Sequence, residues 1–235
     1  MRDLLFSICL CCILSANAQQ ATVEVRGAMR NVMWKGELGA TIQTDTITGK
    51  KGLYGLGPMA FLKGELLLMD GVTYRSSVID SQRMRVEKVA AAGAPFFVYA
   101  HQANWKMMEL PDTVTNLAAL EKYLDRIAAK NDSPFIFRLM GVPDSATIHI
   151  VNLPEGAKVS SPNDAHQGQT NYSVPATRVE LVGFFSRHHQ AVFTHHDTFL
   201  HIHLVTDTKD RMGHLDSIRF QARNMRLFLP AGLLP

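Results

Sequence analysis

The sequence predicts an α+β protein with two sheet-rich halves of mixed or antiparallel strands and one main amphipathic helix at about residues 116–130. Short stretches that alternate apolar and polar side chains recur along most of the 235 residues, as strands with one solvent-facing side do. Glycine-containing turn signals separate these stretches. Only one segment changes to the three- and four-residue spacing of a helix. We expect an N-terminal half at 19–132, which includes the helix, and a C-terminal half at 133–235.

The composition is that of a folded globular protein. Hydrophobic residues make up 46% of the chain and charged residues 19%, which excludes an intrinsically disordered chain. The 24 Lys and Arg exceed the 21 Asp and Glu by only three. Because the basic residues are scattered, no surface that follows a phosphate backbone is indicated, and we expect no nucleic-acid partner.

Residues 1–18 have the pattern of a cleaved signal peptide. A positive start at Arg2 precedes the apolar run Leu4–Leu14, and Ala16-Asn17-Ala18 gives a small-x-small cleavage site. The run is shorter than the roughly 20 residues that span a bilayer. We therefore expect export to the periplasm or the medium, with no membrane contact after cleavage. A lipoprotein is the weaker alternative, because no Cys follows small residues as such a site requires.

All three cysteines lie in that N-terminal segment. The mature chain would then hold no disulfide, and any metal site in it must use His and carboxylate ligands.

Four strands are expected before the helix. Thr22–Arg26 alternates apolar and polar residues, and Met59–Leu62 and Glu65–Met69 are short apolar runs punctuated by glycine. Asp70-Gly71 after the third of these indicates a hairpin, because Gly accepts the positive φ that such turns require. The fourth strand is expected at Pro95–Tyr99.

The helix follows from apolar residues that recur every three or four positions from Asn116 to Lys130, namely Leu117, Leu120, Leu124 and Ile127. Thr115 or Asn116 can cap its start, and Asn131 can end it. It is the one helix that the pattern indicates.

Short strands are expected again in the C-terminal half, at Phe135–Leu139, Ala146–Val151, Arg178–Phe185, Thr198–Val205 and Leu215–Phe220. The segment Asn152–Thr177 is rich in Pro, Gly, Ser, Asn and Gln. It is typical of a long surface loop, which could cover a site.

Seven of the ten histidines lie between His188 and His214. Residues i and i+2 of a strand point to the same face, so His201-Ile202-His203 can present two imidazoles to one cation. Polar alternation on a surface strand is the simpler explanation of such a pair. For the adjacent pairs His188-His189 and His195-His196 that explanation is favoured, because neighbours on a strand point in opposite directions.

A third ligand is available nearby. The segment Thr206–Gly213 is turn-like, and a hairpin centred between Thr208 and Lys209 would set His203 opposite His214. Three histidines on one sheet face match the ligand set of a catalytic zinc site with open positions.

At this point the sequence resembles the α-acetolactate decarboxylase family. The resemblance rests on ordered fragments along most of the mature chain: Gly55-Leu56-Gly57, Gly64-Glu65-Leu66, Asp70-Gly71, Pro95-Phe96, Phe137-Arg138, Gly141, Gly183-Phe184, His201-Ile202-His203 and Gly213-His214-Leu215-Asp216.

The resemblance implies a two-part protein of mixed sheets, and a homodimer is compatible with it. It also implies conversion of 2-acetolactate to acetoin and carbon dioxide, with Zn²⁺ held by His201, His203 and His214. Zinc would act as a Lewis acid for the negative charge that forms on the enediolate. Arg138 would hold the carboxylate or the enediolate. Glu65 would be a further ligand or the group that moves a proton.

The sequence departs from the family at several positions, such as Pro58-Met59, Lys63, Arg187 and Met212. Moreover, the family brings another functional Glu into the site from its C-terminus, and no Glu follows Glu180 here. Loss of a general acid or base slows a reaction by about 10²- to 10⁴-fold. Two alternatives therefore stay open: a catalytically degenerate protein that binds zinc or a metabolite, and a metallohydrolase.

Overall fold

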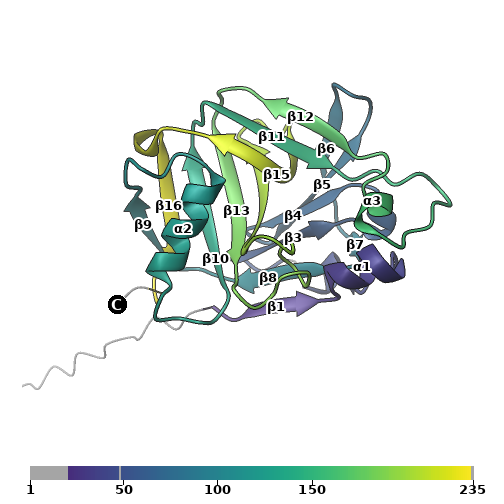
Figure 1. The fold of residues 1–235 in the computed structure, drawn as a ribbon, viewed down its shortest axis with the longest axis horizontal. Helices are drawn as coiled ribbons and strands as arrows, with labels where there is room; N and C mark the ends of the chain where they lie inside the picture. Colours follow the sequence, from purple (N-terminus) through teal and green to yellow (C-terminus); the bar gives the residue numbers. More distant parts are fainter. Residues whose placement is uncertain (1–20, 48, 234–235) are drawn as a thin grey trace, which may run out of the picture.

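The computed structural model describes residues 21–47 and 49–233, and it contains two large antiparallel sheets packed face to face (Figure 1). The predicted sheet-rich α+β class is confirmed. The predicted signal peptide at 1–18 lies outside the described residues.

The first sheet has six strands, in the spatial order β1-β8-β3-β4-β5-β6. Their bounds are Val23–Arg26 (β1), Phe97–His101 (β8), Leu53–Pro58 (β3), Glu65–Met69 (β4), Val72–Val78 (β5) and Met84–Lys88 (β6). The short strands β2 (Ile42–Gln43) and β7 (Gly93–Ala94) pair beside it.

The second sheet has eight strands, in the order β12-β11-β15-β14-β13-β10-β16-β9. Their bounds are Thr170–Val174 (β12), Ser145–Ile150 (β11), Met212–Arg219 (β15), Leu200–Thr206 (β14), Val179–Phe185 (β13), Phe135–Gly141 (β10), Met225–Pro230 (β16) and Trp105–Glu109 (β9). The chain thus passes from the first sheet to the second between His101 and Trp105, whereas the sequence placed the division of the halves at 132.

The core has two main layers. Between the sheets, apolar residues of the first sheet, such as Leu56 and Leu67, pack against Val182 and Phe184 of the second. On the outer face of the second sheet lies α2 (Leu117–Ile127), which buries Leu120 and Leu124 in a larger apolar cluster (Figure 1). The second sheet is therefore covered on both faces, which explains why most residues of β10 and β13, and all residues of β14, are buried.

The helix was predicted well, although two others were missed. The side chain of Asn116 caps α2 by accepting a hydrogen bond from the N–H of Ala119, and the helix ends at Ile127. The sequence did not indicate α1 (Met29–Lys35) and α3 (Pro162–Ala165). Helices of seven and four residues are too short to show a clear period. Both bury apolar residues in one cluster at the end of the molecule.

Two predictions of local structure were wrong. The residues expected to form a strand at Met59–Leu62 form a 3₁₀ turn at Ala60–Leu62, in which Phe61 and Leu62 adopt positive φ, and the strand is β3, just before it. The predicted long loop at 152–177 contains α3 and β12. In both places contacts with distant segments override local composition: Leu153 N–H donates to the carbonyl of Leu62, and β12 pairs with β11.

The other predicted strands are present within a few residues of their expected bounds, and Asp70-Gly71 forms the turn between β4 and β5. Further 3₁₀ turns lie at Thr44–Thr46 and Ala222–Asn224. None of the helices in the described part of the chain combines the length and the hydropathy needed to cross a bilayer.

Candidate metal centre

The hairpin predicted from the turn-like segment is present and has the predicted register. The N–H of Thr206 donates to the carbonyl of Arg211, and Lys209 supplies a positive φ of 59°. The pairing of β14 with β15 then sets His203 directly opposite His214. Local turn chemistry and strand alternation are enough to bring these two imidazoles onto one face.

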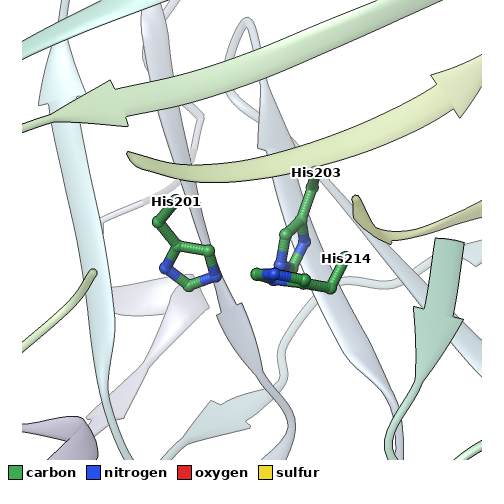
Figure 2. A group of neighbouring side chains, drawn as sticks. All are labelled: His201, His203 and His214. Carbon is green, nitrogen blue, oxygen red and sulfur yellow. The ribbon is translucent and has the colours of Figure 1, made fainter. Parts of the chain in front are cut away.

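The three predicted ligands meet at one point (Figure 2). His201, His203 and His214 each offer a ring nitrogen, and these nitrogens all lie within 4.8 Å of one another. His201 and His203 are buried, and His214 is partly buried. The rings come from both strands of the hairpin and turn toward a shared space, as a chelating set must.

The electrostatics of the cluster favour a cation. Burial lowers the pKa of all three imidazoles, that of His203 to about 3. They are therefore neutral at physiological pH, which is the form that binds a metal. Nδ1 of His201 and both ring nitrogens of His203 are buried without a hydrogen-bond partner. Such orphaned nitrogens are costly in a native fold, and a bound metal would satisfy one nitrogen of each ring.

Glu65 is brought to the cluster, as the resemblance implied. It begins β4 on the opposing sheet, and its Oε2 lies 3.6 Å from Nε2 of His203. Its Oε1 accepts a hydrogen bond of 3.2 Å from the N–H of Val151. The side chain is 3% exposed, and burial raises the pKa of its carboxyl well above the usual value.

Gly64 makes the position of Glu65 possible. Its φ is +147°, and a Cβ there would lie 2.1 Å from the carbonyl oxygen of Ser76. Only glycine fits so close to the neighbouring strand. The Gly-Glu dipeptide is thus a geometric unit that turns the chain into the site.

Arg138 is not brought to the cluster. Its Nε donates to Oε1 of Glu180 at 2.6 Å, and its guanidinium packs against three aromatic rings, those of Tyr54, Trp105 and Phe228. It lies on the same sheet face as His203, but Val182 stands between them on the intervening strand. Two strand spacings separate the residues by roughly 10 Å. Its expected role in substrate binding stays a prediction.

A small chamber of about 30 Å³ adjoins the cluster. Its walls are Met29, Met33, Pro58, Leu62, Glu65, Phe96, His149, Val151, His166, His195, His201 and His214. Sequence reasoning singled out neither His149 nor His166, because each is an isolated histidine in an unremarkable context. It placed His195 among loop or surface residues. His195 does lie in a loop, but its ring is 5.0 Å from that of His214.

A larger cavity of about 410 Å³ lies next to the chamber and shares two wall residues with it, His195 and His214. The cavity forms where the two strands separate, since β14 and β15 pair over only three residues, His203 to Val205. The chamber has room for an ion or a water molecule. The larger cavity has room for a small organic molecule.

The remaining histidines of the predicted stretch lie away from the chamber walls. Nε2 of the exposed His188 pairs with Asp132 at 2.7 Å, and the ring of His189 stacks on Phe193. These contacts agree with the surface or loop role expected for them.

Comparison with known proteins identifies the fold and the family. A family model described as alpha-acetolactate decarboxylase matches residues 27–229. The chain belongs to the α-acetolactate decarboxylase family. Among curated proteins, none matches the sequence.

Three solved structures have the fold of this α-acetolactate decarboxylase family member. The alpha-acetolactate decarboxylase of Bacillus subtilis strain 168 is 16% identical with a TM-score of 0.73, over 89% of this chain and 85% of that one. The acetolactate decarboxylase of Bacillus subtilis subspecies spizizenii is 16% identical with a TM-score of 0.71, over 89% of this chain and 85% of that one. A Staphylococcus aureus protein of unknown function, similar to alpha-acetolactate decarboxylase, is 13% identical with a TM-score of 0.72, over 88% of this chain and 84% of that one.

Proposed function

We propose that this protein decarboxylates 2-acetolactate, or a related 2-hydroxy-3-keto acid, and that His201, His203 and His214 hold Zn²⁺ for the reaction. From 2-acetolactate the products would be acetoin and carbon dioxide. The observation that carries the proposal is the convergence of three neutral imidazoles, with buried unpartnered nitrogens, beside a buried carboxyl group. Membership of the family supports a decarboxylase.

The donor set favours zinc among the common metals. Three imidazole nitrogens and no thiolate suit a borderline cation, and three protein ligands leave positions open for a substrate. Bound zinc would supply a Lewis acid, which stabilises negative charge on a substrate oxygen.

The reaction needs no oxidant or reductant. The bond between the carboxylate and the adjacent carbon breaks, and its electron pair moves toward the neighbouring ketone, whose oxygen takes the negative charge. The carbon that has lost carbon dioxide then receives a proton. Two roles fit Glu65: proton donor to the carbon, or a further ligand. The first is supported by burial, which raises the pKa of its carboxyl well above the usual value and so favours the protonated form.

Apolar walls assist this chemistry. Leu62 and Phe96 are buried beside Glu65 and the histidines. They exclude water and lower the local dielectric, so every charge interaction in the chamber is strengthened.

The direct test is to incubate the zinc-loaded protein with racemic acetolactate and to measure acetoin. We expect turnover that depends on zinc and disappears in His203→Ala, with His188→Ala as the matched control, because His188 is an exposed histidine outside the chamber. Acetoin formation no faster than in His203→Ala would contradict the proposal.

A second candidate is a zinc- or metabolite-binding member of the family without catalytic activity. It is favoured by one observation, that no Glu follows Glu180. It predicts one zinc per chain and no acetoin in the same assay.

We also propose that the protein is exported after cleavage of residues 1–18. Its N-terminus after expression in a bacterial host would then be Gln19, which mass spectrometry of the periplasm and the medium would detect. An unprocessed chain confined to the cytoplasm would contradict this. A homodimer remains a prediction from the resemblance, and light scattering would test it.

A further inference from the structure

The chamber has room for an ion or a water molecule, and its described walls carry none of the cationic side chains that usually bind an acid. Among the described residues that line it, none is Lys or Arg. Once Glu65 and the two ligand histidines in its walls, His201 and His214, are set aside, the polar side chains that remain there are three more imidazoles, His149, His166 and His195. Arg138, the residue expected to bind the substrate, is already paired with Glu180.

His149 is the one of these three whose ring a carboxylate holds. Its Nδ1 lies 2.6 Å from Oδ1 of Asp216, and the other oxygen of Asp216 accepts a bond of 3.4 Å from Nδ2 of Asn171. The side chain of His149 is thereby fixed, and the residue is 6% exposed. A carboxylate that accepts from one ring nitrogen leaves the other for the site.

The strand pairing places the ring of His149 beside that of His214. β11 pairs with β15 so that His149 lies opposite His214, and the two ring centroids are 4.7 Å apart. Gly213 permits this approach, because a Cβ there would lie 2.5 Å from the carbonyl oxygen of His149. His149 is nevertheless outside the group of mutually close nitrogens, which contains only the three ligand histidines. It lies beside the metal position without belonging to it.

We propose that His149 is a substrate-binding residue: its Nδ1 donates to Asp216, and its Nε2 hydrogen-bonds an oxygen of the bound 2-hydroxy acid. The proposal rests on the proposed function and names the group that the resemblance assigned to Arg138. His149 orients the acid from β11, beside His214, while Glu65 lies on the opposing sheet. Asp216 acts through His149, as a positioning residue.

Two variants of His149 distinguish the contributions of its two ring nitrogens. His149→Asn keeps an amide near the position of Nδ1, where it can reach Asp216, and removes the group at Nε2. His149→Gln keeps an amide near Nε2 and gives up the bond to Asp216. Asp216→Asn weakens the positioning alone. His188→Asn is the matched control, because His188 forms the same kind of pair with Asp132 on the exposed surface.

The measurements are zinc content, KM and kcat with racemic acetolactate, and the affinity of the zinc-loaded protein for 2-hydroxyisobutyrate by calorimetry. That acid keeps the hydroxyl and carboxylate but has no ketone, so it binds without reacting. We expect His149→Asn to retain zinc and to weaken binding of the acid by roughly tenfold to a hundredfold, the range for one hydrogen bond to a charged group. KM should rise with it. His149→Gln and Asp216→Asn should lose less, and His188→Asn should match the wild type.

Three results would overturn the proposal: unchanged affinity in His149→Asn, loss of zinc or of folding in all three site variants, or no binding of 2-hydroxyisobutyrate by the wild type. The calorimetry separates this inference from the proposed function. A wild type that binds the acid but forms no acetoin would refute decarboxylation. The affinities of the His149 variants for 2-hydroxyisobutyrate would still test whether His149 binds the acid.

Discussion

His203 and Arg138 lie on the same face of one sheet, in register through Val182, and their surroundings differ completely. The guanidinium of Arg138 has an ion-pair partner in Glu180 and three aromatic rings around it. His203 is fully buried, and neither ring nitrogen has a hydrogen-bond partner. The polar group of Arg138 thus finds its partners within the protein, whereas the ring nitrogens of His203 do not.

Unpartnered polar atoms indicate which of the two regions binds a ligand. A buried polar atom without a partner costs about 1–3 kcal/mol, so a fold that retains several such atoms in one place is compensated elsewhere or by a ligand. A charged residue whose partners are all internal has a structural explanation. By this criterion the histidine cluster is the candidate site, whereas the contacts of Arg138 are accounted for within the protein. Four experiments test this difference.

The largest effect is expected at His203. Replacement by Ala removes a ligand from the cluster, so zinc should be lost and acetoin formation should fall by roughly 10³-fold or more, because the Lewis acid contributes several kcal/mol. Metal analysis and the acetoin assay would measure both losses. Retention of stoichiometric zinc by this variant would show that the ion lies elsewhere.

Glu65→Gln should have the next largest effect. Gln keeps an oxygen that can accept from the N–H of Val151, so the fold should persist. The rate constant kcat should fall by about 10²-fold, as for loss of a general acid or base. Zinc content distinguishes the two roles: a proton donor can be lost with the metal retained, whereas loss of zinc would identify Glu65 as a ligand.

The metal-free protein should become less stable in acid because of the cluster. Above pH 6.5 the histidines are neutral in both folded and unfolded states. Below it the unfolded chain binds protons, whereas buried His203 of the folded protein, with a pKa of about 3, does not. The free energy of unfolding therefore falls as the pH drops from 6.5 to about 3. The loss should be on the order of a few kcal/mol.

Urea unfolding of the metal-free protein at a series of pH values would check this. In His203→Gln the fall should be smaller, because that side chain does not titrate. In His188→Gln, which changes an exposed histidine, it should equal that of the wild type. An identical pH dependence in all three proteins would contradict the prediction.

The smallest effect is expected from Arg138→Gln. Loss of the ion pair with the partly buried Glu180, whose side chain is 15% exposed, should lower the free energy of unfolding by about 1–2 kcal/mol. Zinc content should not change. Glu180→Gln should produce a similar loss, and the double variant less than the sum of both. An activity loss larger than that of Glu65→Gln, without a stability change, would restore Arg138 to the catalytic site.

Part of this picture could be read from local sequence. The alternation in β1 and β14, the cap and spacing of α2 and the turn after Thr206 each depend on neighbours within a few residues. Register followed from the same information, since a hairpin turn fixes which residues face each other. His203 and His214 could therefore be paired in advance. The short helix α1 and the turn at Ala60–Leu62 could not be predicted from local sequence, because contacts with distant segments hold them in place.

The site shows the same division. The three-histidine face follows from local sequence, because two hairpin strands and a period of two are local properties. The surroundings of that face depend on the packing of the whole chain. This packing brought Glu65 across from the other sheet, set His149 beside His214 and against Asp216, and kept Arg138 two strands away. These placements depend on how whole sheets pack, and the free energy of that packing is spread over many apolar contacts far apart in the chain.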